Sequence, residues 1–345
     1  MSKKSTKILL AVFSITIICA IIIYKKKGKA STVDSAARDF KIKDTASITR
    51  IFIADKEGDK SNLQRTKSGW IVNDKYPCRT DAILNLMEAI RNVEVKMPVN
   101  KKALDNVIKV MASSALKIEI YNGDELVKQY YIGHETPDSE GSYMLLTDID
   151  SGENFDEPFV CFIPGFVGYL IPRYIAKESE WRDRTVINFI PPQIKSITVK
   201  YTQSPDSSFG IQLTDTKTFS LLDSEGKQLP FDEFKMKQYI AYFQNLQYEG
   251  LITGVNKKLE DSLHKVGPFA IVTVNENNFR QSAYKFYYKK ASPMLAMEHG
   301  VKYDYDPDRM FLRFENDKEW ALVQNFVFGK LLINSNYFLP ATVKK

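Results

Sequence analysis

Histidine and cysteine, two residue types that often carry catalysis, are few in this chain of 345 residues, and they stand far apart. The three histidines are His134, His264 and His299, and none belongs to an HExxH zinc motif. The chain contains neither the GxSxG motif of serine hydrolases nor a phosphate-binding P-loop. We therefore predict no catalytic, cofactor-binding or metal-binding residues. An enzyme whose site is scattered along the sequence stays an alternative.

One acidic run has the spacing of a calcium-binding loop. Asp304, Asp306 and Asp308 alternate, and Glu315 stands at the twelfth position counted from Asp304. Such a loop needs glycine at its sixth position, where this chain has Arg309, and the residues that follow have the pattern of a strand. We therefore expect no calcium site in this run.

The three cysteines are Cys19, Cys78 and Cys161. In an exported protein Cys78 and Cys161 could form a disulfide, because export places them in an oxidising compartment. The alternative is that each fills apolar space as a free thiol. Cys161 lies in the apolar run 159–163, which predicts a buried strand, and we favour the free thiols.

Trp181 is followed by three charged residues, Arg182, Asp183 and Arg184, within a joint that we place at residues 176–193. Tryptophan and arginine are enriched among the residues that dominate the free energy of protein–protein binding. The four residues are therefore a possible interaction surface. The alternative, which we favour, is that Trp181 packs between two domains while the charged side chains form ion pairs at the surface.

Residues 8–24 form an unbroken apolar stretch with lysines on both sides. As a helix this stretch is near the lower length limit for crossing a bilayer. We predict a basic tail at 1–7, a transmembrane anchor at 8–24 and a polar tether at 25–46. A cleaved signal peptide is the alternative, but small residues do not follow the stretch as cleavage requires. Isoleucines precede Cys19, which argues against an acylated lipoprotein cysteine.

The lysines are nearly balanced across the apolar stretch, so the positive-inside rule favours neither orientation strongly. Moving the basic tail outward is costly against the membrane potential, whereas a long domain is exported largely regardless of its charge. We therefore predict a single-pass inner-membrane protein that contacts membrane lipid through residues 8–24 and has a periplasmic body. In the alternative, the body is cytoplasmic and the lysines at 25–29 lie against the anionic leaflet.

The formal net charge of +6 belongs to the N-terminal segment. The first thirty residues hold seven lysines and no acidic residue, so 41 of the 48 basic residues remain in the body, against 42 acidic ones. A body with a net charge near −1 lacks the basic surface that general nucleic-acid binding requires. We therefore expect no nucleic-acid partner.

Residues 47–175 and 194–340 contain the same pattern twice: strand, hairpin, proline, helix, alternating strand and aromatic strand. A shift of 153 positions places Pro77 on Pro230 and aligns the apolar residues of the two expected helices. The aligned residues are Ile83, Leu86, Met87, Ile90 and Val93 in the first copy, and Met236, Tyr239, Ile240, Phe243 and Leu246 in the second. We therefore predict an α+β fold, in which a transmembrane helix precedes two similar units, each an antiparallel sheet with helices packed on one face.

Several short motifs accompany this pattern. They are Ile48-Thr-Arg-Ile-Phe-Ile-Ala-Asp55, Gly69-Trp-Ile-Val-Asn73, Lys75-Tyr-Pro77, Thr136-Pro-Asp138, Tyr143-Met-Leu-Leu146, Ile163-Pro-Gly-Phe166 and Trp181-Arg-Asp-Arg-Thr185. Together with the anchor, they resemble the bacterial family called domain of unknown function 4340, found in Bacteroidota-type envelopes among others. The resemblance implies a membrane-tethered envelope protein, and it implies for some members an association with auxiliary components of ABC-type export or gliding machinery. It implies no catalytic residues.

These features together favour a non-catalytic envelope protein that acts as an interaction module or scaffold for an envelope protein partner. The alternatives are an accessory subunit of an ABC-type transporter or of gliding or export machinery, and an envelope enzyme. A deep polar pocket or clustered buried carboxylates would favour the enzyme. An aromatic groove or an exposed sheet edge would favour the scaffold.

Overall fold

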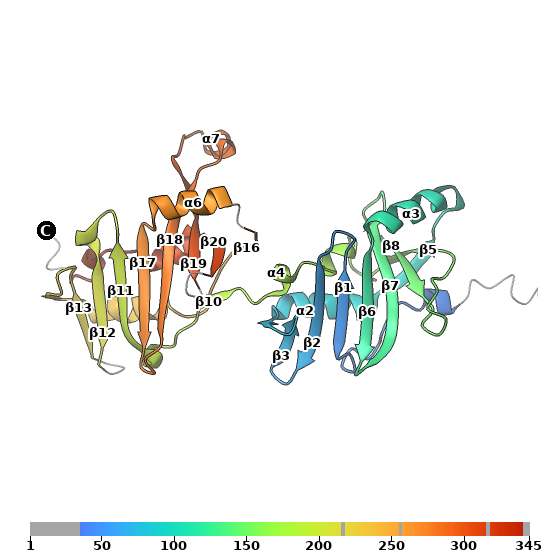
Figure 1. Ribbon diagram of the computed structural model, residues 1–345, viewed down its shortest axis with the longest axis horizontal. Coiled ribbons are helices and arrows are strands. Elements are labelled where there is room, and N and C mark those ends of the chain that lie inside the picture. Colours follow the sequence, from blue (N-terminus) through green and yellow to red (C-terminus); the bar gives the residue numbers. More distant parts are fainter. Residues whose placement is uncertain (1–34, 215–217, 255–256, 315–317, 341–345) are drawn as a thin grey trace, which may run out of the picture. The chain divides into compact units, whose positions relative to one another are not determined.

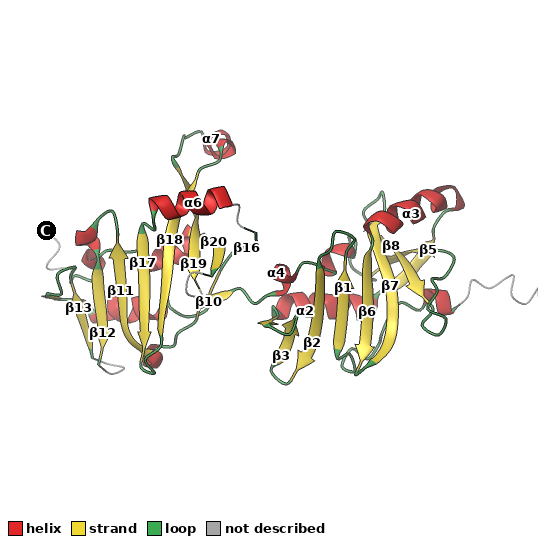
Figure 2. Ribbon diagram, viewed as in Figure 1, coloured by secondary structure: helices red, strands yellow, loops and turns green. Residues whose placement is uncertain are grey.

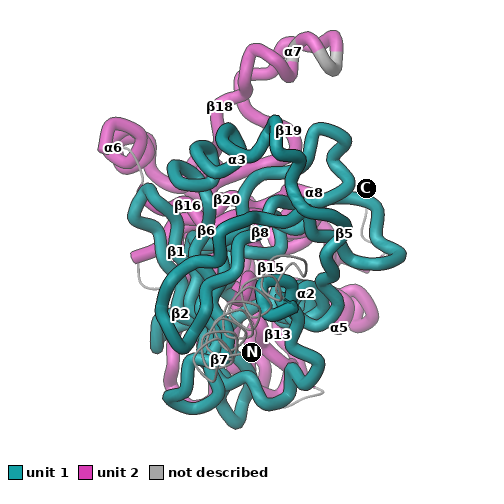
Figure 3. The backbone as a smooth tube through the Cα atoms, turned by 90° about the vertical axis from the view of Figure 1, so that its right-hand side faces the viewer, with its two compact units in different colours: residues 1–182 teal, residues 183–345 magenta. Residues whose placement is uncertain are grey.

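The computed structural model describes residues 35–214, 218–254, 257–314 and 318–340. The chain divides into two compact units, Met1–Arg182 and Asp183–Lys345 (Figure 3). The predicted anchor at 8–24 and the first part of the tether lie outside the described residues. Within the described ranges, no helix is long and apolar enough to span a membrane.

The first unit is built on a nine-stranded antiparallel sheet, counted over its described residues (Figure 1). Its strand order is β4-β3-β2-β1-β6-β7-β8-β9-β5. The strands are β1 (Arg50–Ala54), β2 (Lys60–Thr66), β3 (Gly69–Val72), β4 (Tyr76–Pro77), β5 (Glu94–Pro98), β6 (Leu116–Asn122), β7 (Glu125–Glu135), β8 (Ser142–Thr147) and β9 (Phe159–Phe162).

The second unit contains a nine-stranded antiparallel sheet among its described residues, in the order β14-β13-β12-β11-β17-β18-β19-β20-β16. Its strands are β11 (Ile194–Tyr201), β12 (Phe209–Leu213), β13 (Phe219–Leu222), β14 (Gln228–Leu229), β16 (Gly250–Ile252), β17 (Ala270–Glu276), β18 (Gln281–Lys290), β19 (Tyr305–Phe314) and β20 (Glu319–Gln324). A separate short pair joins β10 (Thr185–Ile187) to β15 (Leu246–Gln247).

The two sheets share both strand order and register. Each strand of the first sheet has a counterpart at the same place in the second. Equivalent inter-strand pairs are Ile51–Ile120 and Ile197–Val274, Ile53–Ile118 and Val199–Val272, and Ile118–Tyr130 and Val272–Tyr284. The fold is therefore α+β with two large antiparallel sheets, consistent with the predicted pair of similar units.

Both helices expected from apolar spacing form, but the second, α5 (Glu233–Ala241), is shorter than predicted, because it ends at Ala241 and Leu246 lies in β15. Helix α2 (Thr80–Asn92) buries Leu86 and Ile90 in the core of the first unit. Helix α5 buries Met236 and Tyr239 in the core of the second unit. Asp232 begins α5, where its carboxylate accepts hydrogen bonds from backbone N–H groups of the first turn, the usual role of an N-cap.

The expectation that helices cover only one face of each sheet is wrong. Tyr130 packs in the core with α2, but its neighbour Tyr131 packs with α3 (Lys101–Ser114) through Met111. Successive strand residues point to opposite faces, so α2 and α3 lie on opposite faces of the sheet. In the second unit α6 (Lys257–Val266), labelled in Figure 2, packs Leu263 against Tyr287 and Trp320. Phe286, the neighbour of Tyr287, packs in the core with α5, so α6 and α5 lie on opposite faces of the sheet.

The remaining helices are short. Helix α4 (Glu178–Trp181) ends the first unit, and α7 (Pro293–His299) and α8 (Asn325–Phe328) belong to the second. Figure 1 shows α7 projecting beyond the second sheet on the connection between β18 and β19. The equivalent connection in the first unit spans only residues 136–141 and contains no helix. The 3-10 turns are Ala36–Arg38, Ile171–Arg173, Pro191–Gln193, Pro205–Ser207, Gly329–Leu331 and Ser335–Tyr337.

Candidate ligand pocket

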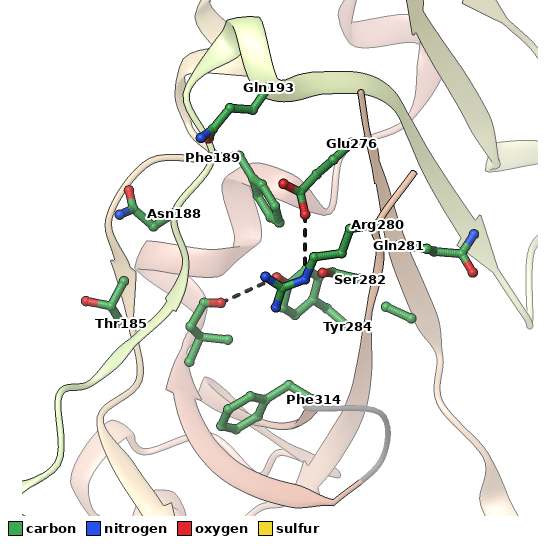
Figure 4. A pocket seen from close by; sticks show the side chains of 12 residues that line it. Thr185, Asn188, Phe189, Gln193, Glu276, Arg280, Gln281, Ser282, Tyr284 and Phe314 are labelled. Atoms are coloured by element: carbon green, nitrogen blue, oxygen red, sulfur yellow. Dashed lines mark hydrogen bonds and ion pairs between the residues drawn. The ribbon is translucent and has the colours of Figure 1, made fainter. Parts of the chain in front are cut away.

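A pocket of about 340 Å³ opens in the second unit, between the segment that begins this unit and the hairpin formed by β17 and β18 (Figure 4). The first segment contributes Thr185, Val186, Asn188, Phe189 and Gln193, and the hairpin contributes Glu276, Arg280, Gln281, Ser282, Ala283 and Tyr284, with Phe314 from β19. All of these residues belong to one unit, so a single folded body positions them.

Glu276 lies at a core-facing position of its strand. In β17 the buried residues alternate, and Glu276 continues the series begun by Ala270, Val272 and Val274. Its backbone N–H donates to the carbonyl of Arg280 at 2.8 Å, which closes the turn between β17 and β18. The strand geometry therefore points a carboxylate toward the interior, where an apolar side chain would be the usual choice.

The Glu276 carboxylate is buried without a full set of partners. Its side chain is 10% exposed, and Oε1 has no hydrogen-bond donor among the described residues. Arg280 Nε lies 3.7 Å from Oε1, and the Arg280 side chain is 74% exposed. Asn278 Nδ2 lies 3.5 Å from Oε2. A buried charge costs free energy unless it is paired and hydrogen-bonded, so Glu276 is poised to accept a donor from a ligand.

The other polar groups of the pocket are held in place by the protein. The Tyr284 hydroxyl points at the carbonyl of Val186, at 3.4 Å (Figure 4). The Asn188 side chain accepts from the backbone of Asn245 at 3.3 Å, and the Gln193 side chain accepts from a backbone N–H at 3.1 Å. Figure 4 also shows the rings of Phe189 and Phe314 among the lining side chains. The pocket is thus lined mainly by polar side chains, several of them fixed by the protein, with a few apolar rings beside them.

The interaction surface considered at the joint is not part of this pocket. Trp181 is fully buried in the core of the first unit, where its indole N–H donates to the carbonyl of Ile175 at 2.7 Å. Arg182 is half-buried, and its guanidinium lies 3.5 Å from the centroid of the Tyr76 ring. The Trp181 ring is therefore core rather than surface.

The two charged residues that follow belong to the second unit. Asp183 is exposed, and its carboxylate accepts from the backbone of Thr185 at 2.8 Å. Arg184 is half-buried, and its carbonyl accepts from the backbone of Tyr248 at 3.0 Å. A role for Arg182, Asp183 and Arg184 in partner binding stays a prediction.

In the calcium-like run the carboxylate of Asp306 is engaged by internal contacts, and Glu315 lies outside the described residues. Asp306 is buried and its carboxylate lies 2.6 Å from Lys289 Nζ. It also accepts from the backbone N–H groups of Asp308 and Arg309. Burial opposes ionisation, but these hydrogen bonds and the lysine charge hold the pKa of Asp306 below its usual value.

The two cysteines that the structure describes form no disulfide. Cys78 and Cys161 are both free thiols and both buried, and burial raises the pKa of Cys78 to about 12. The His264 Nε2 atom lies 2.6 Å from the guanidinium of Arg313. Over the described ranges, no group of three or more His, Cys, Asp or Glu residues could hold a metal ion.

Sequence reasoning did not identify Glu276. The signal was present in the alternation of Ala270, Val272 and Val274, because the next position of that series is an acidic residue.

Comparisons with known proteins identify no relative, because no family model, no curated protein and no solved structure matches the chain. The function must therefore be inferred from the residues and the pocket.

Proposed function

We propose that this chain is a membrane-tethered envelope protein that acts as a binding module and holds a small polar ligand in the pocket of its second unit. The observation that carries the proposal is the buried Glu276 carboxylate, whose Oε1 lacks a hydrogen-bond donor among the described residues at the wall of a 340 Å³ pocket. The apolar stretch at 8–24 supports the tether. The resemblance to domain of unknown function 4340 supports the envelope.

The size and the lining of the pocket support a small ligand. Its volume is at the lower end of the range of roughly 300–1,000 Å³ that is typical of ligand pockets. Most of the lining residues are polar, which suits a polar ligand, and the protein's own hydrogen bonds hold several of them in position. Such preorganised groups bind a ligand with little loss of conformational entropy.

Two similar units allow the body to divide its roles. The pocket lies entirely within the second unit. We assign the envelope protein partner to the first unit and to the joint residues Arg182, Asp183 and Arg184. We propose that such a partner responds to ligand occupancy of the second unit, which makes the body an interaction module rather than a passive spacer.

A thermal-shift experiment on the full chain in detergent tests the proposal. A ligand that binds only the folded state raises the melting temperature. Wild-type protein is melted with and without a small-molecule extract of the envelope of its own host. Ser282→Lys places a long side chain in the pocket, and Ser224→Lys adds the same charge at an exposed turn as the matched control.

The extract should raise the melting temperature of wild type and of Ser224→Lys, and it should leave Ser282→Lys unchanged. Equal shifts in all three proteins would mean that any ligand binds elsewhere. The absence of a shift in wild type would contradict a small-ligand site.

A further inference from the structure

The pocket of the second unit has a counterpart in the first unit, where a lysine side chain, Lys128, occupies the equivalent position. In β7, Lys128 is paired with Ile120, and in β18, Ser282 is paired with Val274. Because Ile120 and Val274 occupy the same register position in equivalent strands, Lys128 and Ser282 are equivalent residues. A lysine in one copy thus corresponds to a serine in the other.

The Lys128 ammonium group is held by oxygen atoms of the segment that precedes the first sheet. The side chain is 11% exposed. Its Nζ donates to the carbonyl of Asp39, to the Asp39 carboxylate at 3.0 Å and to the carbonyl of Lys41 at 3.5 Å. Three acceptors match the three N–H donors of a primary ammonium group.

The same segment can be aligned in the second unit through its backbone bonds. The Ile42 N–H donates to the carbonyl of Ile90, and the Phe189 N–H donates to the carbonyl of Phe243. Ile90 and Phe243 are the residues aligned by the internal repeat. Counting three residues back from Ile42 and from Phe189 makes Val186 the counterpart of Asp39.

The carbonyl that binds Lys128 in the first unit therefore has a counterpart at the pocket of the second. Val186 lines the pocket, and its carbonyl accepts the hydroxyl of Tyr284 (Figure 4). Val186 brings no carboxylate in place of that of Asp39, but Glu276 supplies one from β17. The first unit thus binds the ammonium group of its own Lys128, whereas the second unit has a carbonyl and a carboxylate but no lysine at the equivalent position.

We propose that the pocket of the second unit binds a primary ammonium group, with the Glu276 carboxylate as its ion partner and the Val186 carbonyl as a second acceptor. This inference rests on the proposed function, namely that the pocket is a ligand site. The ammonium group comes from a free small amine or from a lysine side chain presented by a partner, and both sources share this chemistry.

Arg280 does not substitute for such a ligand. Its Nε lies 3.7 Å from Glu276 Oε1, beyond hydrogen-bond distance, and its side chain is 74% exposed. Only Glu276 of this pair is buried, and the largely exposed Arg280 guanidinium can return to water at small cost when a ligand ammonium group takes its place. The compact ammonium group can also approach the buried oxygen more closely than a planar guanidinium can.

Isothermal titration of the full chain in detergent tests this inference with defined probes. The free-amine probe is n-pentylamine, and the lysine probe is Nα-acetyl-lysine N-methylamide. The Nε-acetylated form of the lysine probe is the neutral control. The protein variants are Glu276→Gln, Ser282→Lys and Glu225→Gln, the last removing an exposed charge from the same unit.

We expect at least one amine to bind wild type and Glu225→Gln with equal affinity. We expect Glu276→Gln to lose about tenfold or more in affinity, because the charge-assisted hydrogen bond is lost. Ser282→Lys and the neutral control should show no binding. Tighter binding of n-pentylamine would assign the site to a free amine, and tighter binding of the lysine probe would assign it to a partner lysine.

Failure of both amines to bind wild type, or equal affinity for wild type and Glu276→Gln, would overturn the inference. If the envelope extract still stabilises wild type but not Ser282→Lys, only the ammonium assignment fails and the ligand site stands. If neither the extract nor an amine acts on wild type, both proposals fail. Glu276→Gln keeps the test decisive even if Ser282→Lys does not fold.

Discussion

At the scale of single residues, Glu276 is the position where this chain departs from the rules of a stable core. An acidic side chain follows three small apolar residues on the same strand face and is buried to nine-tenths. A protein that accepts such a cost in its folded state commonly does so for function.

Glu276→Gln should therefore be at least as stable as wild type in the absence of ligand, by up to about 1 kcal/mol, because it removes an incompletely paired buried charge. Urea denaturation of both proteins in the same detergent measures the difference. A variant that is clearly less stable than wild type would show that Glu276 serves the fold rather than a ligand.

The sequence around Trp181 fits both a binding hot spot and a packed ring, and the ring packs in the core of the first unit. Tryptophan beside arginine suggests a binding hot spot, but the ring is fully buried and its N–H is bound to a carbonyl of the same unit. The charged residues near Trp181 belong to the short helix α4 and its flanks, and they do not indicate where the indole ring lies.

Trp181→Ala should lower the free energy of unfolding of the first unit by about 3–5 kcal/mol, the usual cost of removing a large buried aromatic side chain. Trp181→Phe should cost less, but it leaves the carbonyl of Ile175 without its donor. Chemical denaturation measures both values. An unchanged stability together with lost partner binding would restore the interface interpretation.

At the scale of elements, the helices and strands that could be predicted are those with a clear apolar periodicity in the sequence. Helices α2 and α5 follow from apolar residues at helical spacing after a proline, and the paired strands follow from alternation in two aligned copies. Periodicity could not place α3 and α6 on the sheet face opposite to α2 and α5, because the apolar pattern of a helix does not indicate which face of a sheet the helix covers.

The pocket was beyond prediction for a related reason. It depends on the contrast between Lys128 and Ser282, two ordinary residues whose equivalence becomes visible only when both strand registers are known. Its second wall comes from Thr185–Phe189, a segment distant in sequence from β18. Sequence spacing cannot report such a juxtaposition.

A separate prediction concerns Lys128 of β7 and the site in the first unit where its ammonium group is bound. Lys128→Ala should lower the stability of the first unit by about 1–2 kcal/mol. The carbonyl bonds account for most of this cost, because Asp39 is 66% exposed and its ion pair is weakened by solvent. Lys117→Ala removes a lysine that is 37% exposed, against 11% for Lys128, and should cost less, because Glu119 keeps its hydrogen bond from the Tyr121 hydroxyl.

The loss in Lys128→Ala should also be partly reversed by n-pentylamine, which can occupy the emptied ammonium site. Thermal melting with and without the amine measures the rescue. If the amine stabilises Lys117→Ala and Lys128→Ala equally, the lysine site is not a model for the pocket of the second unit.

At the scale of the whole molecule, both cores bury groups that are neutral at pH 7. Burial raises the pKa of Tyr130, Tyr174, Tyr201 and Tyr239, and that of Cys78 to about 12. Each folded-state pKa lies above its unfolded value, so the associated stability is complete below the unfolded pKa and is lost as the pH rises through the folded one.

The denaturation midpoint should therefore be nearly constant from pH 7 to about pH 8.5 and should fall between about pH 9 and pH 12, as unfolded cysteine and tyrosine side chains ionise. Urea titrations at a series of pH values measure this profile. A midpoint that rises over this alkaline range would contradict the burial of these hydroxyls and thiols.

The central claim at this scale is that the body is held by one membrane anchor and binds its ligand in the envelope. The most direct measurement is a pair of reporter fusions after Lys345, one active only outside the cytoplasm and one active only within it. Our account predicts activity of the exported reporter alone, with the chain in the membrane fraction. Activity of the cytoplasmic reporter alone would contradict the claim and would place the pocket at the inner face of the membrane.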